Sequence, residues 1–187
     1  VVIIKKGLII MTLIIDPQSS GIAGNMLIGA FVDLGADASE LKEIMEKSAK
    51  EFGEVNVEFN KVSKHGIEST YCHVEMLEHK HSINFKDFIS KIKELELEDN
   101  VKATSINIFK RIAEAEAKVH GKSLEEVHFH EVGASDAVAD VIGSVYAYYS
   151  LGYDGQKIIG LPIAVGGGRV KTAHGTIPVP VPAVVWR

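Results

Sequence analysis

The segment VHFHEVGASDAVAD, residues 127–140, gathers two histidines and three carboxylates among residues that are otherwise mostly small or apolar. His128 and His130 are two positions apart, so an extended chain would point both imidazoles to one face and Phe129 to the other. Paired imidazoles bind nickel, zinc or copper, and Glu131 follows directly. We therefore predict that His128, His130 and Glu131 are metal ligands. A strand with hydrogen-bonded histidines is the structural alternative, and it is the commoner explanation of an isolated H-x-H pair.

Two further carboxylates follow on a predicted helix, residues 135–150. Asp136 and Asp140 are four positions apart and share one helix face. A first-turn charge that favours the helix dipole explains Asp136 but not Asp140, which lies one turn deeper. We predict catalytic roles for both. The other residues on their face are all small, a pattern that suits a ligand or a close neighbour better than solvent: Gly143, Ser144 and Ala147.

The segment DPQSSGIAGNM, residues 16–26, reads as the end of a buried strand, a turn and the start of a helix. Free N–H groups at a helix start attract anions, and glycines let a phosphate approach the backbone. The segment is neither a Walker A loop nor a dinucleotide fingerprint. A tight turn needs glycine in any case, so a purely structural explanation is equally good. We predict that Asp16 is catalytic, holding a metal or a hydroxyl group, and that four residues of the turn bind the ligand or its phosphate: Ser20, Gly21, Gly24 and Asn25.

Two other segments carry possible ligand groups. In GGGRVKTAHG, residues 166–175, Gly167 and Lys171 would suit an anionic ligand, and His174 could join the catalytic group. A flexible turn with surface charges explains the same residues. In EHKHS, His79 and His81 form a loop that could collect a metal, or a solvated turn.

Composition limits the classes of function. The chain has 187 residues, 46% of them hydrophobic and 24% charged, with a net charge of −5. Such a chain can bury a core and lacks the positive field that attracts nucleic acid or anionic lipid, so we expect neither partner. The single cysteine, Cys72, excludes an internal disulfide and suggests a reducing cytoplasm; we expect it to pack as a small hydrophobe. No signal peptide is recognisable at the start, and residues 1–10 are interpreted as an extension, either from an upstream start or as an added edge strand.

The periodicities predict an α+β fold, a two-layer antiparallel or mixed sheet with helices and a ferredoxin-like middle portion. Asp37 is the predicted cap of the second helix and Ser82 that of the third. Strands are expected at about 11–16, 54–62, 67–77, 127–132 and 157–165, and helices at about 25–35, 38–52, 83–95, 100–120 and 135–150.

Three segments together resemble one known family. DPQSSGIAGNM, VHGKSLEEVHFHEVGASDAVADVIG and LPIAVGGGRVKTAHGTIPVPVPA are similar to the LarC-type nickel insertion proteins, from about Leu13 to Ala183. The resemblance implies a lyase-class chelatase that inserts nickel into a dithiolated pyridinium mononucleotide. The product is the nickel-pincer nucleotide cofactor of lactate racemase. The family is about twice this length and uses CTP with a divalent metal in its C-terminal half, so residues 11–187 would be the N-terminal domain, and this chain alone should not hydrolyse CTP.

The chain departs from the family pattern at two positions. Asn25 stands where the family usually has aspartate, which removes one charge, and Gln18 stands where an aromatic residue is common. If that aspartate binds metal in relatives, metal affinity here should be weaker.

The resemblance assigns the candidate residues to one function, the binding of nickel and of the nucleotide. The nucleotide would ligate nickel through sulfur and the protein would ligate it through imidazole. The glycine turns and Lys171 would bind the phosphate. We also expect a homo-oligomer. Two other functions remain open: a metal-dependent phosphohydrolase, and a non-catalytic module for ligand docking or assembly.

Overall fold

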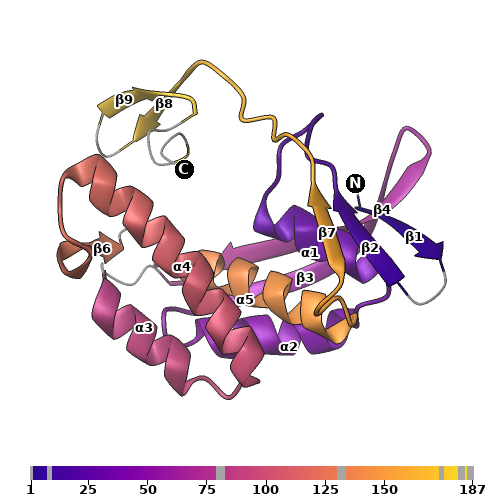
Figure 1. The fold of residues 1–187 in the computed structure, drawn as a ribbon, viewed down its shortest axis with the longest axis horizontal. Coiled ribbons are helices and arrows are strands. Elements are labelled where there is room, and N and C mark those ends of the chain that lie inside the picture. The colour runs from indigo at the N-terminus through magenta and orange to yellow at the C-terminus, as the bar shows by residue number, and fades with distance from the viewer. Residues whose placement is uncertain are drawn as a thin grey trace.

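The computed structural model describes residues 2–7, 10–78, 83–129, 134–172, 175–180 and 184, with side chains from residue 12 on except at 172. It confirms the predicted α+β class (Figure 1). None of the helices in these ranges is long and apolar enough to cross a membrane. In chain order the elements are β1 (Val2–Gly7), β2 (Ile10–Ile15), α1 (Gly24–Asp33), α2 (Ala38–Ala49), β3 (Val55–Lys64), β4 (Ile67–Met76), β5 (Ile83–Asn84), α3 (Phe85–Glu94), α4 (Asp99–His120), the 3-10 turn η1 (Leu124–Glu126), β6 (His128–Phe129), α5 (Ser135–Ser150), β7 (Lys157–Gly160), β8 (Arg169–Thr172) and β9 (Gly175–Pro178).

Helix α5 is the centre of the molecule and packs against α1, α2 and α4 (Figure 1). Its residues belong to two apolar clusters: Ala139 and Ala147 pack with α1, α2 and the β3–β4 strands, whereas Val138 and Ile142 pack with α3, α4 and β6. The small residues predicted to face a ligand are therefore partly explained by packing. A Cβ atom on Gly143 would lie 2.7 Å from the Cγ atom of Met45, so α2 approaches α5 there too closely for a side chain.

A three-stranded sheet, in the order β1–β2–β7, positions the turn between β2 and α1. This turn, residues 16–23, is called the first glycine turn below. Strand β1 runs antiparallel to β2, so residues 2–7 form an edge strand, one of the two alternatives for the extension. Strand β7 runs parallel to β2, and the pairing continues beyond both strands. Leu161 donates to the carbonyl of Ile15 at 2.9 Å, and Ala164 to that of Pro17 at 3.2 Å. The segment after β7 therefore lies along the turn that follows β2.

Strands β3 and β4 form the predicted antiparallel hairpin. Val57 pairs with Val74 and Cys72 pairs with Phe59 on the face turned to the core. The two-residue turn places both His65 (φ 53°) and Gly66 (φ 81°) in the left-handed region, which matches the twist of a tight hairpin. A ferredoxin-like middle portion would require four strands in one sheet. In the part of the chain that the structure describes, β3 and β4 pair only with each other.

Most helix ends lie where the sequence predicts them. Helix α1 ends with Gly35 at φ 112°, and the amide of Ala36 donates back to the carbonyl of Phe31, the Schellman pattern. Helix α4 ends at Gly121 in the left-handed conformation. Asp37 caps α2, accepting from the amides of the second and third helical residues. Helix α2 stops at Ala49, three residues earlier than predicted.

The cap of α3 is Asn84, and the prediction of Ser82 is wrong. The Oδ1 atom of Asn84 accepts from the amide of Asp87 at 2.9 Å, and Asn84 also pairs with His128 across β5 and β6.

Replacing Asn84 by alanine should lower the free energy of unfolding by about 1 kcal/mol, because an amide at the start of α3 loses its acceptor. Urea denaturation followed by circular dichroism measures the change. Ser90→Ala, at an exposed position within the same helix, is the control and should change stability by less than about 0.5 kcal/mol. Equal midpoints for the wild-type chain and Asn84→Ala would contradict this cap.

Candidate functional site

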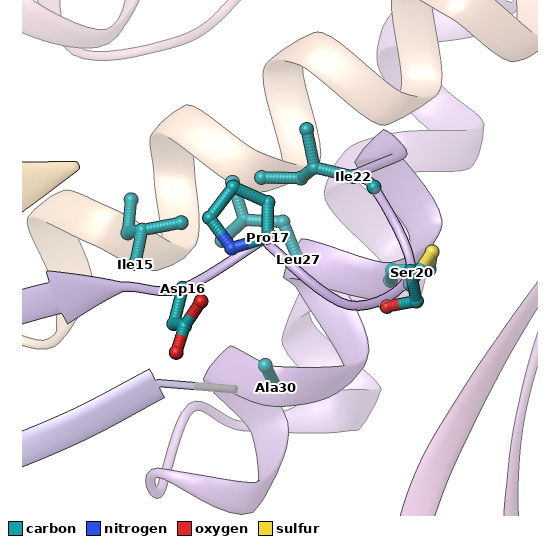
Figure 2. A pocket seen from close by; sticks show the side chains of 9 residues that line it. Ile15, Asp16, Pro17, Ser20, Ile22, Leu27 and Ala30 are labelled. Carbon is teal, nitrogen blue, oxygen red and sulfur yellow. The ribbon is translucent and has the colours of Figure 1, made fainter. Parts of the chain in front are cut away.

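A pocket lies where β2 gives way to the glycine turn and α1 (Figure 2). Its volume is about 70 Å³, room for several water molecules, and it is open to solvent on one side. Asp16 is the only charged residue among those that line it, and Ser20 is the only hydroxyl. The lining residues are Ile15, Asp16, Pro17, Ser20, Gly21, Ile22, Met26, Leu27 and Ala30.

Hydrogen bonds within the turn fix its shape. The Oδ1 atom of Asp16 accepts from both the backbone and the side-chain nitrogen of Gln18, each at 3.1 Å. The amide of Gly21 donates to the carbonyl of Pro17 at 3.0 Å. Gly21 has φ 73°, and a Cβ atom there would lie 2.8 Å from the carbonyl oxygen of Ala164. The glycine is thus required by the packing of the segment after β7, whatever the turn binds.

Asp140 reaches from α5 to the start of α1. A backbone hydrogen bond from Asn25 supports its carboxylate, and a Cβ atom on Gly24 would lie 2.5 Å from the Cβ of Asp140. Ala23, the residue that precedes α1, supplies no side-chain cap. Asp140 therefore acts as a cap donated by another helix, and its negative charge lies near the positive end of the α1 dipole. Gly24 is the residue that permits this approach.

The environment of Asp140 raises the pKa of its carboxyl group to about 6. Burial is the main cause, since it penalises the charged form; the Asn25 hydrogen bond opposes it, and the charge of Asp136 adds to it. The Oδ1 atom is buried and has no hydrogen-bond partner among the described residues. A carboxyl group with this pKa can both take and release a proton near neutral pH.

Cys72 and Asn25 lie beside Asp140. Burial and the nearby Asp140 charge raise the pKa of the Cys72 thiol to about 12, so the thiol stays protonated at neutral pH. The Nδ2 atom of Asn25 donates to the carbonyl of Cys72 at 3.3 Å. An aspartate at position 25 could not donate this bond, so Asn25 ties α1 to β4.

The proposed metal ligands are only partly described. His128 is exposed on β6 while Phe129 is buried, as expected of alternating strand residues. Within the described ranges, no three side chains of histidine, cysteine, aspartate or glutamate come together as a metal site. His128 thus does not form such a site with the described carboxylates. The other predicted ligands and one catalytic candidate lie outside the described residues: His79, His81, His130, Glu131 and His174.

The third predicted segment lies apart from the first turn. Figure 1 shows the chain after β7 extending away from the three-stranded sheet, with the β8–β9 hairpin at its far end. Gly167 and Lys171 are exposed there, and Lys171 pairs with Thr176 in the hairpin. Their role in binding a phosphate stays a prediction.

Comparison with known proteins decides the family. The family model described as nickel insertion protein matches residues 13–186. The chain belongs to the nickel insertion protein family. A relative from Methanosphaera stadtmanae, named a nickel insertion protein, is 46% identical over 94% of this chain and 45% of its own length. One from Methanothermobacter thermautotrophicus with the same name is 44% identical over 92% of this chain and 43% of its own.

A third member of the family carries a more specific name. The pyridinium-3,5-bisthiocarboxylic acid mononucleotide nickel insertion protein of Desulfitobacterium hafniense is 42% identical over 89% of this chain and 40% of its own length. The chain thus spans less than half the length of these curated relatives. No solved structure matches it.

In this chain, sequence reasoning selected Asp16 and Asp140 as candidates but missed the backbone groups that lie against α1 and the turn before it. The carbonyl of Cys72 accepts a hydrogen bond from Asn25 of α1, and the carbonyl of Ala164 lies against Gly21 in the turn; no residue pattern signals a carbonyl. The glycines at positions 21 and 24 were the only sequence signal of these close contacts.

Proposed function

We propose that this chain is the N-terminal part of a nickel chelatase that handles the dithiolated pyridinium mononucleotide while nickel is inserted. The product is the nickel-pincer nucleotide cofactor that lactate racemase uses, and the reaction falls in the lyase class. CTP and a divalent metal act in a C-terminal half beyond this chain. The protein works in the cytoplasm as a homo-oligomer, and it binds neither nucleic acid nor membranes.

One observation within the chain supports this role most directly. Asp140 is a mostly buried carboxyl group with a pKa of about 6, one oxygen without a partner among the described residues, and a position at the start of α1, whose first two turns also line the pocket. When nickel replaces the ring hydrogen to form a nickel–carbon bond, that hydrogen leaves as a proton. Asp140 is a suitable acceptor, because a pKa near the working pH favours general base catalysis. We assign further acid–base roles to Asp16, Asp136 and His174.

The remaining candidate residues are assigned either to the metal or to the phosphate. His128, His130 and Glu131 hold nickel from the protein side while the two thiocarboxylate sulfurs of the nucleotide hold it from the other. His79 and His81 collect nickel and pass it on. Gly167 and Lys171 bind the nucleotide phosphate.

Nickel titration of this chain by calorimetry, with and without the dithiolated nucleotide, tests the proposal. The nucleotide should increase nickel affinity at least tenfold. His128→Ala should weaken it by about tenfold or more, since losing even a group that supports a metal ligand costs about that much. His120→Gln, at the C-terminal end of α4, is the matched control and should leave binding unchanged.

Two outcomes favour other functions. If the chain binds no nickel with the nucleotide present, and His128→Ala has no effect in a full-length relative, the chain is a docking or assembly module. If it hydrolyses generic phosphate esters when manganese or zinc is added, it is a metal-dependent phosphohydrolase.

A further inference from the structure

We propose that the outer edge of β7 and the apolar residues after it bind a β-strand from the portion that longer nickel insertion proteins carry outside the matched region. The proposed function enters only through the statement that this chain is one part of such a protein. The residues concerned form an interaction surface and take no part in the chemistry.

The backbone of β7 is paired on one side. Strand β7 lies at the end of the three-stranded sheet, and β2 is the only described element in extensive contact with it (Figure 1). The amide of Leu161 donates to the carbonyl of Ile15, so the backbone groups of Ile159 also point to β2. Successive residues of a strand turn these groups to opposite sides, so those of Ile158 and Gly160 point away from β2. No described strand pairs with them there.

Other strand edges of the molecule are closed by side chains. On the outer side of β3, Glu46 of α2 accepts from the amide of Val57 at 2.9 Å. On the outer side of β4, Asp33 of α1 accepts from the amide of Thr70 at the same distance. No described side chain closes the backbone of β7 in this way. Its edge is therefore a template on which a further strand can pair.

The side chains at this edge also lack cover. Leu13 and Ile158 are neighbours across β2 and β7, so they lie on one face of the sheet. Leu13 is 1% exposed and Ile158 is 48% exposed, which shows that the layer covering β2 does not extend over β7. Parallel strands normally lie in sheets that are covered on both faces. The pair β2–β7 therefore lacks a neighbour at this edge.

Exposed apolar residues continue beyond β7. The carbonyl of Ala164 lies against Gly21, which brings the residues on either side of Ala164 beside the first glycine turn. Those two residues, Ile163 and Val165, are 40% and 44% exposed, and Ile22 in the turn is 42% exposed. A run of exposed apolar side chains along one edge is typical of a surface that another protein segment covers.

The length of the relatives indicates which segment this is. The matched region makes up 45%, 43% and 40% of the three relatives described above, so each has more than half of its residues outside it. A strand from that portion would pair with β7 within one chain, at an effective concentration that a separate molecule does not reach. We therefore assign the edge to that portion and not to a second copy.

Hydrogen exchange of single amides tests the proposal in this chain and in the full-length relative from Methanosphaera stadtmanae. In this chain the amides of Ile159 and Leu161, which point to β2, should exchange about a hundredfold more slowly than those of Ile158 and Gly160. In the full-length relative the amides at all four matching positions should exchange slowly, because a strand on each side then holds them.

A lysine substitution separates edge pairing from general stability. Lysine at the position of the relative that matches Ile158 should remove most of the added protection, since a charge enters the interface. Lysine at the position that matches Ile67, which is 74% exposed at the tip of the β3–β4 hairpin, is the control and should leave the protection unchanged.

Three results would overturn the proposal. The amides of Ile158 and Gly160 could already be protected in this chain, their protection could rise with the concentration of this chain, as pairing between copies requires, or the matching amides of the relative could exchange as fast as they do here. Nickel takes no part in these measurements. A protected edge in a relative that inserts no nickel would reject the proposed chelatase alone, and nickel insertion with an unprotected edge would reject this interface alone.

Discussion

Replacing Gly29 by alanine should lower the free energy of unfolding by about 2–3 kcal/mol, the upper part of the range of about 1–3 kcal/mol expected for overpacking a core site. Helix propensity alone predicts the opposite, since alanine is favoured over glycine in a helix interior by about 1 kcal/mol. Packing around Gly29 decides whether the substitution raises or lowers the free energy of unfolding. The added Cβ atom would lie 2.3 Å from the carbonyl oxygen of Thr70, so α1 would have to move away from β4.

The strand cannot easily move instead. Asp33, at the end of α1, accepts from the amide of Thr70 at 2.9 Å and from its hydroxyl at 2.6 Å, and thereby ties strand and helix together. Urea denaturation measures the loss. Gly160→Ala is the matched control, because a Cβ atom there meets no heavy atom within 4 Å, and it should be close to neutral. A Gly29→Ala chain as stable as the wild type would show that α1 and β4 are not in this close contact.

Replacing Asp140 by asparagine should have the largest pH-dependent effect. The carboxyl pKa is about 6 in the folded chain against a reference value of 3.8, so the folded state retains a proton that the unfolded state has lost. The wild type should therefore lose stability as the pH rises from about 4 to 6. The full shift corresponds to about 3 kcal/mol, and partial solvent contact reduces the expected gain of Asp140→Asn at pH 7 to about 1–2 kcal/mol.

Denaturation at pH 4 and at pH 7 measures this effect as the difference between the two chains. The asparagine variant should be more stable at pH 7 and equal to the wild type at pH 4, since asparagine can still accept from Asn25. Asp154→Asn, at an exposed position, should show no such change between the two pH values. A variant that is less stable at pH 7 would mean that the charged carboxylate is a net stabiliser of α1. The proposed function predicts that the matching substitution in a full-length relative lowers nickel insertion activity, because asparagine cannot accept a proton.

The sequence predicted those parts of the fold that are set by neighbouring residues. Strict alternation gave the β3–β4 hairpin, Gly35 and Gly121 gave two helix ends, and Asp37 gave a cap. Each of these signals acts within one turn of helix or one pair of residues. Ser82 failed as a cap because the backbone enters α3 two residues later, after the short β5–β6 pairing that no local pattern indicates.

The sequence suggested candidate residues for the site but not their arrangement. Sequence alone selected Asp140 as a carboxylate too deep in its helix for a surface role. Its raised pKa and its contact with the start of α1 depend on α5 packing between other helices. Likewise, Gly21 and Gly24 suggested an anion site, and the structure adds that both positions lie in close contact with Ala164 and Asp140.

The sequence by itself determined the family, the candidate side chains and most of the local elements, because motifs and periodicities are properties of neighbouring residues. Only the tertiary structure decided which charges surround the first turn and which amides remain free to bind a ligand. Those properties depend on atoms brought together from β4, α5 and the segment after β7, and on the desolvation that their packing imposes.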